Sequence, residues 1–215
     1  ADADLGRLRW ALNEAKGESS GNQYEAALQA FLETWGATEV GARARAQLAE
    51  RYEITARPAQ AHQVASGLPP ALRDSVGGKW CANVLARLET PILSLRTEAL
   101  WPSHPLEPTT IAIQFKNHRQ LYFRAVRMDW ELFLRKEWPR PNQFQPEHWK
   151  RIRQLPAETN WVVTLPSAPN YQERTFQVPA PQGLRPGFYL ILASPDPNFA
   201  QSDQSWINAT SVWVT

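Results

Sequence analysis

Proline and alanine are divided sharply between the two halves of this sequence. Residues 1–90 hold 3 of the 18 prolines and 19 alanines, whereas residues 91–215 hold 15 prolines and 9 alanines. Alanine favours helices, and proline is excluded from helix interiors and central strands. The sequence therefore predicts an α+β chain with an all-α domain over residues 1–90 and an all-β domain over residues 91–215.

Apolar residues recur at intervals of three and four along the first half, which is the spacing of an amphipathic helix. Ala27 and Ala61 lie 34 residues apart, and Ala27 with Phe31 fits the small-then-aromatic spacing of tetratricopeptide helices. The first half is therefore predicted to be a helical array that is loosely tetratricopeptide-like. The expected helices cover residues 5–12, 24–35, 40–52, 58–67 and 70–88.

Several residues predict where these helices begin and how regular they are. Asn22 and Thr38 are the expected N-caps of the second and third helices. Pro58 and Pro70 are expected in the first turns of the fourth and fifth helices, where proline costs no hydrogen bond. The Gly77-Gly78 pair is expected to weaken or kink the fifth helix near its middle.

The second half alternates apolar and polar residues in short runs separated by proline-rich turns. This pattern predicts a seven-stranded antiparallel β-sandwich. The first long pair of runs, joined by the polar residues 116–120, is expected to form a β-hairpin. Residues 129–135 are expected to form a short helix or turn, and residues 136–156 a long loop. The expected strands cover residues 92–95, 111–115, 121–128, 161–165, 175–178, 187–193 and 211–215.

A turn signal precedes the sixth expected strand. Pro186 presets φ, and Gly187 is expected to supply the left-handed residue of a type II turn. Tyr189 then enters the strand at the place of the tyrosine corner in immunoglobulin-like sandwiches. We therefore expect Tyr189 to be structural, with its hydroxyl bonded to backbone across the corner.

Cys81 is the single cysteine and the first candidate for chemistry. The neighbouring Lys79 could lower the pKa of the thiol and make it a nucleophile. The favoured alternative is that Cys81 is a small buried hydrophobe beside the apolar stripe of the fifth helix. One cysteine excludes an internal disulfide framework and any all-cysteine metal site.

The four histidines, His62, His104, His118 and His148, are far apart in the sequence. Because no His-Glu-x-x-His spacing occurs, the helical zinc-protease motif is absent. His104 with Glu107 could contact a metal, but the surrounding prolines favour a solvated loop. No catalytic, cofactor-binding or metal-binding residue is therefore assigned, no cofactor is expected, and the chain is predicted not to be an enzyme.

Positive charge concentrates in residues 116–153, which contain ten Lys or Arg and four Asp or Glu. The aromatics Trp130, Trp138, Phe144 and Trp149 are interleaved with these charges, as on a surface for nucleic acid or polysaccharide. The favoured alternative is a solvated segment whose aromatics anchor it to the sandwich. The whole chain has a net charge of +2, too balanced for nucleic-acid binding, so no nucleic-acid partner is predicted.

Three remaining features carry little information about function. No run of about 18 apolar residues occurs, so no membrane span is predicted. The 10 tryptophans are numerous, but tryptophan serves cores, interfaces and sugar platforms alike. Asn208-Ala209-Thr210 matches the N-glycosylation motif, although three-residue matches arise easily by chance.

Four stretches of the chain carry family-like motifs. They are Gly78 and Cys81 ahead of Thr90-Pro91-Ile92-Leu93-Ser94-Leu95, the run from Gln114 to Asp129 with Asn117 and Leu121-Tyr122-Phe123-Arg124, and the segments 184–194 and 211–215. Together they resemble the amino-terminal region of bacterial alpha-2-macroglobulins, which are large periplasmic protease inhibitors. The resemblance covers residues 75–215 well and residues 1–75 loosely.

The resemblance implies a helical segment followed by a β-sandwich of macroglobulin or fibronectin-like type. It also implies a periplasmic location, with any membrane anchor outside residues 1–215, and a non-catalytic structural or interaction role in a protease trap. The implied partners are the remaining domains of a longer chain, proteases that meet the intact protein, and other periplasmic or cell-wall proteins. The thioester motif Cys-x-Glu-Gln of the family is absent, because Ala82-Asn83-Val84 follows Cys81.

Two other functions stay open at this point. A carbohydrate- or peptidoglycan-binding sandwich would expose the aromatics of residues 130–149. A small enzyme would place a histidine or an acid beside an exposed Cys81.

Overall fold

The chain folds into two compact units. The computed structural model describes residues 1–14, 19–102, 108–131, 135, 139–140, 143–167, 171–200 and 207–215. The first unit contains residues 1–90 together with residues 170–172, and the second contains residues 91–169 and 173–215. The chain is thus a mixed α+β protein, with helices in the first unit and two sheets in the second.

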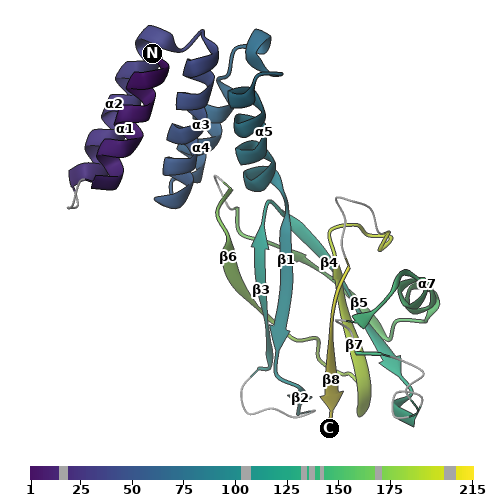
Figure 1. Cartoon of the computed structure of the whole chain (residues 1–215). Coiled ribbons are helices and arrows are strands. Elements are labelled where there is room, and N and C mark those ends of the chain that lie inside the picture. The colour runs from purple at the N-terminus through teal and green to yellow at the C-terminus, as the bar shows by residue number, and fades with distance from the viewer. Residues whose placement is uncertain are drawn as a thin grey trace. The chain divides into compact units, whose positions relative to one another are not determined.

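The helices of the first unit pack side by side, with α3 and α4 between α1 and α2 on one side and α5 on the other (Figure 1). Helix α3 contacts α1, α2, α4 and α5, so it forms the middle of the unit. Tyr171 joins this unit by stacking on His62 of α4, with ring centroids 4.3 Å apart. The helices are α1 (Asp2–Glu14), α2 (Ser19–Trp35), α3 (Glu39–Ile54), α4 (Pro58–Ser66), a 3-10 turn (Pro70–Leu72) and α5 (Val76–Glu89).

The starts of these helices agree only partly with the sequence predictions. Thr38 caps α3, because its hydroxyl accepts a hydrogen bond from the Gly41 N–H at 3.1 Å. Pro58 is the first residue of α4, as predicted. Asn22 is not a cap, because α2 already begins at Ser19. An apolar stripe marks the buried face of a helix but does not mark its first polar turn.

The start of α5 is the largest correction in the first unit. The helix begins at Val76 with Ser75 as its cap, so Gly77-Gly78 lies in the first turn rather than near the middle. A Cβ atom on Gly77 would lie 2.3 Å from the backbone nitrogen of Arg43. Gly77 therefore lets α5 approach the backbone of α3, whereas a Cβ atom on Gly78 would lie 2.2 Å from the Leu72 carbonyl oxygen in the turn before α5.

A buried carboxylate ties three helices of the first unit together. Glu25 of α2 is buried and accepts a hydrogen bond from Arg51 Nε of α3 at 3.2 Å. It also accepts one from Arg57, which precedes α4 and lies over the Tyr52 ring at 4.5 Å from the centroid. Because the charge is paired and hydrogen-bonded, it is tolerated inside the unit.

Within its described residues, the second unit contains one strand more than predicted. A three-stranded sheet has the order β1-β3-β6, and a five-stranded sheet has the order β2-β8-β7-β4-β5 (Figure 1). The additional strand β2 has two residues and pairs in parallel with β8. The strands are β1 (Ile92–Thr97), β2 (Leu100–Trp101), β3 (Thr110–Lys116), β4 (Gln120–Met128), β5 (Thr159–Thr164), β6 (Arg174–Pro179), β7 (Gly187–Ser194) and β8 (Asn208–Val214).

The predicted hairpin between β3 and β4 is wrong. Strand β3 pairs with β1 and β6, whereas β4 pairs with β5 and β7 in the other sheet. Asn117, which adopts a positive φ of 60°, lies in the turn that carries the chain from one sheet to the other. Alternation of apolar residues fits a strand in either sheet, so it did not identify the pairing partner.

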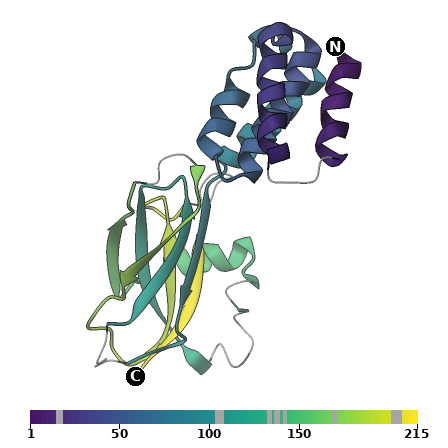
Figure 2. The ribbon, with the colours of Figure 1, turned by 90° about the vertical axis from the view of Figure 1, so that its left-hand side faces the viewer.

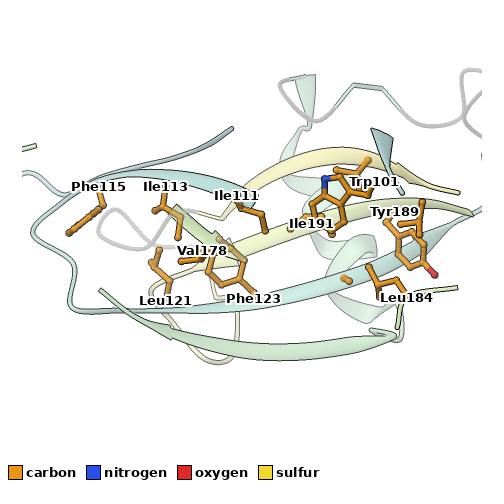
Figure 3. Close-up of a cluster of buried hydrophobic side chains, with 14 of the residues drawn as sticks. Trp101, Ile111, Ile113, Phe115, Leu121, Phe123, Val178, Leu184, Tyr189 and Ile191 are labelled. Carbon is orange, nitrogen blue, oxygen red and sulfur yellow. The ribbon is translucent and has the colours of Figure 1, made fainter. Parts of the chain in front are cut away.

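One hydrophobic core lies between the two sheets (Figure 3). Strand β3 contributes Ile111, Ile113 and Phe115 to it, and β4 contributes Leu121 and Phe123. Each set consists of alternate residues of its strand, which point to the same face. The second unit is therefore sandwich-like, with three strands on one side and five on the other.

The tyrosine corner is confirmed. The Tyr189 hydroxyl donates to the carbonyl oxygen of Arg185 at 2.8 Å and lies 2.9 Å from the Glu158 carboxylate. Arg185 binds the same carboxylate through its backbone N–H at 3.0 Å and through its guanidinium. Gly187 has a φ of 151°, so the position does require glycine, although the angle differs from the value of about +80° in a type II turn.

Residues 146–154 form a helix where a loop was expected. Helix α7 (Pro146–Gln154) packs on the outer face of the five-stranded sheet, away from the main core (Figures 1 and 2). Its buried side chains are Trp149 and Ile152. They pack with Val126, Leu190 and Leu192 in a second hydrophobic cluster, separate from the core between the sheets. The sequence did not predict this helix, because only Trp149 and Ile152 are buried in it and the surrounding residues are prolines and polar residues. Two apolar residues three positions apart are too few to define an amphipathic helix.

Candidate interaction surface

Aromatic side chains gather on the outer face of the five-stranded sheet. Trp130 lies against Phe188, with ring centroids 4.8 Å apart, and against Trp213, with centroids 5.3 Å apart. Leu100 lies beside them, because it is the strand partner of Trp213. The exposed fractions are 51% for Leu100, 40% for Trp130 and 37% for Trp213. We call Leu100, Trp130, Phe188 and Trp213 the aromatic patch.

The strands themselves place the patch on the outer face. In β8, Val212 and Val214 point into the core, so Trp213 between them points outward. Strand β2 is held beside β8 by two backbone bonds, from Trp213 N–H to the Ala99 oxygen at 2.7 Å and from Thr215 N–H to the Trp101 oxygen at 3.0 Å. Leu100, Phe188 and Trp213 therefore stand on paired strands, whereas Trp130 follows the end of β4 and lies against them.

The other aromatics of the basic segment mostly serve packing. Trp149 of α7 is buried against the sheet, and Phe144 meets its ring edge-on with centroids 5.1 Å apart. His148 accepts a hydrogen bond from the Gln145 N–H through Nδ1 at 2.9 Å, so it caps α7. Trp138 lies outside the described residues. These contacts support the interpretation that aromatics anchor this segment to the sandwich.

Several positive charges of residues 116–153 are also engaged within the unit. Arg124 lies over the Phe199 ring, 4.3 Å from the centroid. Arg127 donates to the Pro186 carbonyl at 2.9 Å, and Arg153 donates to the Trp149 carbonyl at 3.3 Å. Lys116 is buried. The charge excess is therefore spread over separate local contacts rather than lined up along one groove.

Cys81 is buried, as predicted, with 1% of its surface exposed. Its thiol lies 3.8 Å from the carbonyl oxygen of Ala42. Burial raises the pKa of Cys81 to about 11, and the charge of Arg45 only partly opposes that shift. The thiol is therefore protonated at neutral pH, which is the opposite of what a cysteine nucleophile requires.

The three described histidines, His62, His118 and His148, lie in different parts of the chain. His62 forms a 2.8 Å contact with Glu89, through Nε2 and Oε1. His118 is partly buried, and burial lowers its pKa. His104 and Glu107 lie outside the described residues, so the metal contact suggested for them is untested. Within the described ranges, no three His, Cys, Asp or Glu side chains come together as a metal site would require.

Two smaller sequence features also have a place in the structure. Asn208 of the glycosylation motif belongs to β8 and pairs with Ala193, so it lies in a sheet rather than a loop. None of the described helices is long and apolar enough to cross a membrane.

Sequence reasoning identified one member of the aromatic patch, Trp130, as an aromatic of the basic segment that anchors to the sandwich, but it did not identify the residues that Trp130 contacts. The residues that surround it come from β2, β7 and β8 and are distant in the sequence. Trp213 had one local signal, since it alternates with the apolar Val212 and Val214 at the outward position. Leu100 had none, because a two-residue strand has no recognisable period.

Comparisons with known proteins give weak results. No protein-family model matches the chain, and no curated protein matches its sequence. One similar solved structure is a CARDB domain from Pyrococcus furiosus in complex with di-metal ions, with 14% identity and a TM-score of 0.31, covering 59% of this chain and 90% of that one. Another is Escherichia coli alpha-2-macroglobulin in its native conformation, with 15% identity and a TM-score of 0.31, covering 59% of this chain and 10% of that one.

Proposed function

We propose that this chain is a non-catalytic contact module, which binds a protein surface through the aromatic patch. The observation that carries this proposal is the half-exposed cluster of Leu100, Trp130 and Trp213 at the outer face of the five-stranded sheet. Aromatic residues are enriched at the centres of protein interfaces, because they bury large areas at a small cost in conformational entropy.

A protein partner fits this patch better than a glycan. Sugar rings stack on flat aromatic faces, whereas Trp130 and Trp213 meet edge to face at an interplanar angle of 82°. The exposed surface is therefore ridged rather than a continuous platform. Leu100 adds an aliphatic group that offers no hydrogen bond to a sugar hydroxyl.

More specifically, we propose that the module belongs to an alpha-2-macroglobulin-like protease trap and that the patch contacts another sandwich domain of the same protein. The motif-like stretches in residues 78–128, 184–194 and 211–215 support this assignment. The order of a helical unit followed by a sandwich-like unit is compatible with it. A periplasmic location is part of the same proposal.

Photo-cross-linking from Leu100 tests the contact directly. A benzoylphenylalanine would replace Leu100 in the cells that make the protein, and the product would be identified by mass spectrometry. We expect a cross-link to one β-sandwich segment, either of the same polypeptide or of a macroglobulin-type partner. Ile54, which is 78% exposed on α3, is the matched control and should not give that product. The same product from both positions, or cross-links to glycan alone, would contradict the proposal.

Binding and activity assays separate the rival functions. The isolated chain should leave a general protease fully active on small and large substrates, because covalent capture through Cys-x-Glu-Gln is impossible here. It should not sediment with peptidoglycan, and it should not bind DNA at physiological salt. A thiol reagent should label Cys81 slowly in the native protein, because the thiol is buried and protonated. Rapid labelling at neutral pH would revive the enzyme alternative.

A further inference from the structure

Strand β5 forms one edge of the five-stranded sheet, at the opposite end of the strand order from the aromatic patch. Its residues are Thr159-Asn160-Trp161-Val162-Val163-Thr164. Trp161 packs on the core, stacked on Phe123 with ring centroids 4.9 Å apart. The alternate residues Asn160, Val162 and Thr164 are exposed, and Val162 has 51% of its surface in solvent.

The backbone of β5 presents unused hydrogen-bonding groups on its outer side. Leu165 N–H donates to the Arg119 oxygen at 2.9 Å, which fixes the odd-numbered residues as those that bond β4. In an antiparallel ladder, the N–H and C=O groups of alternate residues point to opposite sides. Those of Asn160, Val162 and Thr164 therefore point away from β4, and no described residue bonds to them.

This edge lacks the features that usually prevent strand pairing. Edge strands are protected by charges, by proline or by being very short. Among the described edges, β2 has two residues, β1 carries the exposed Arg96, and β6 begins at Arg174 and ends at Pro179. Strand β5 has six residues, and none of them is charged or proline.

We propose that β5 pairs with β5 of a second copy of this chain, antiparallel and across a two-fold axis at Val162. The outward groups then form about six backbone hydrogen bonds, and the two five-stranded sheets become one continuous sheet. This inference rests on β5 alone and is independent of the function proposed for the aromatic patch.

The sequence of β5 is complementary to itself in this register. Val162 lies opposite its own copy, which gives an apolar pair on the outer face. Asn160 lies opposite Thr164 of the other copy, which gives two neutral polar pairs. On the inner face, Trp161 lies opposite Val163, so both cores are extended by an aromatic and β-branched pair. No like charges face each other within the strand.

The surroundings of β5 leave this approach open within the described residues. Arg124 is adjacent to Asn160 on β4, but its guanidinium lies over Phe199 instead of extending over β5. Glu158, which precedes β5, is neutralised by Arg185 at 3.1 Å. Helix α7 packs with Val126 and Leu190, so it covers β4 and β7.

Disulfide trapping tests both the pairing and its register. In the proposed dimer, the Cα atoms of the two Val162 residues are about 5.5 Å apart, which is within the disulfide range. The variant Val162→Cys should therefore form a disulfide-linked dimer under mild copper-catalysed oxidation. Cys81 does not compete, because it is buried.

The variant Asn160→Cys is the matched control. Asn160 is exposed on the same face of the same strand, but in the proposed dimer the two residues at position 160 are about 13 Å apart along the strand direction. This variant should stay monomeric under the same oxidation. Equal cross-linking of both variants would indicate random collision, and absence of cross-linking in both would exclude the pairing, so either result overturns the proposal.

Sedimentation equilibrium of the unmodified chain provides a second measurement. A single strand pair is a small interface, so we expect a weak, concentration-dependent dimer. Val162→Lys places two charges on the axis and should weaken the dimer by about tenfold or more. Val162→Thr keeps a neutral β-branched residue and should change it by less than about threefold. A chain that stays monomeric at millimolar concentration would overturn the proposal.

Discussion

The two units of this chain build their cores from residues of different size. In the helical unit, the buried residues at the centre of α3 include Ala42, Ala44, Ala46 and Ala49, and α5 meets this helix through Gly77. In the second unit, large side chains such as those of Phe115, Phe123 and Tyr189 fill the space between the sheets (Figure 3).

This difference predicts opposite weaknesses. Helices that touch backbone to backbone leave no room for an additional methyl group, so the first unit should be sensitive to atoms that are added. Sheets lie about 10 Å apart and need large side chains between them, so the second unit should be sensitive to atoms that are removed.

Truncating Phe123 should have the largest effect. This side chain is almost fully buried in the sandwich core and stacks on Trp161. Phe123→Ala should lower the free energy of unfolding by about 3–5 kcal/mol, measured by urea denaturation. The control Val162→Ala removes exposed atoms from the neighbouring strand β5 and should cost less than about 1 kcal/mol. A loss for Phe123→Ala as small as the one expected for Val162→Ala would show that the sandwich core does not depend on this side chain.

Adding one methyl group to Gly77 should have the next largest effect. The new Cβ would lie 2.3 Å from the Arg43 nitrogen and 2.4 Å from the Ala42 carbonyl carbon, and backbone atoms cannot move aside cheaply. Gly77→Ala should therefore destabilise the helical unit by about 1–3 kcal/mol, despite the higher helix propensity of alanine.

Gly6 in α1 is the matched control for this substitution. Outside the adjacent backbone of α1 itself, no atom lies within 4 Å of a Cβ built at that position, so Gly6→Ala should be neutral or slightly stabilising in a thermal melt. If Gly77→Ala also raised the melting temperature, the close contact between α5 and α3 would not exist as described.

The sequence predicted local features correctly but failed on features that depend on contacts between distant parts of the chain. Thr38, Pro58 and Tyr189 were placed correctly, because a cap, a first turn and a corner each depend on a few consecutive residues. The β3–β4 hairpin was wrong, and the aromatic patch was missed. Both depend on strands that are distant along the chain, and residue alternation contains no information about such partners.

The hydrogen bonds that Arg185 and Tyr189 make to the Glu158 carboxylate should make the stability of the second unit depend on pH in the acid range. Hydrogen bonds from Arg185 lower the pKa of Glu158 to about 2. Since the carboxyl pKa is lower in the folded state, its stabilisation is fully present above the unfolded pKa of about 4.5 and is lost as the pH falls through about 2. Glu158→Gln should therefore cost about 1 kcal/mol at pH 7, because the exposed Arg185 is screened by solvent.

The pH dependence identifies the cause of that loss. The difference in unfolding free energy between the wild type and Glu158→Gln should shrink between pH 4.5 and pH 2, and urea denaturation at several pH values measures it. Glu131 contacts Arg135 at 3.5 Å, and both side chains are exposed, so Glu131→Gln should change stability by less than about 0.5 kcal/mol at any pH. A constant difference down to pH 2 would assign the loss to packing instead of charge.

The smallest effect is expected from placing glycine at a left-handed backbone position. Each unit has one such position for this comparison, Ala56 in the first and Asn117 in the second. Ala56 has a φ of 57° after α3, where Arg57 N–H donates to the Tyr52 oxygen at 2.8 Å and Ala56 N–H donates to the Glu53 oxygen at 3.1 Å. This is the position that favours glycine at the end of a helix. Ala56→Gly should therefore stabilise the helical unit by about 0.5 kcal/mol, visible as a small rise in melting temperature.

Asn117 is the corresponding position in the second unit, with a φ of 60° between β3 and β4. Asparagine tolerates this conformation far better than alanine does, because its short polar side chain can bond locally. Asn117→Gly should therefore bring no gain, since any relief of backbone strain is small and the more flexible unfolded chain opposes it. A larger gain at Asn117 than at Ala56 would show that the strain lies in the turn between the sheets. Such a result would contradict the expectation that asparagine tolerates the left-handed conformation better than alanine does.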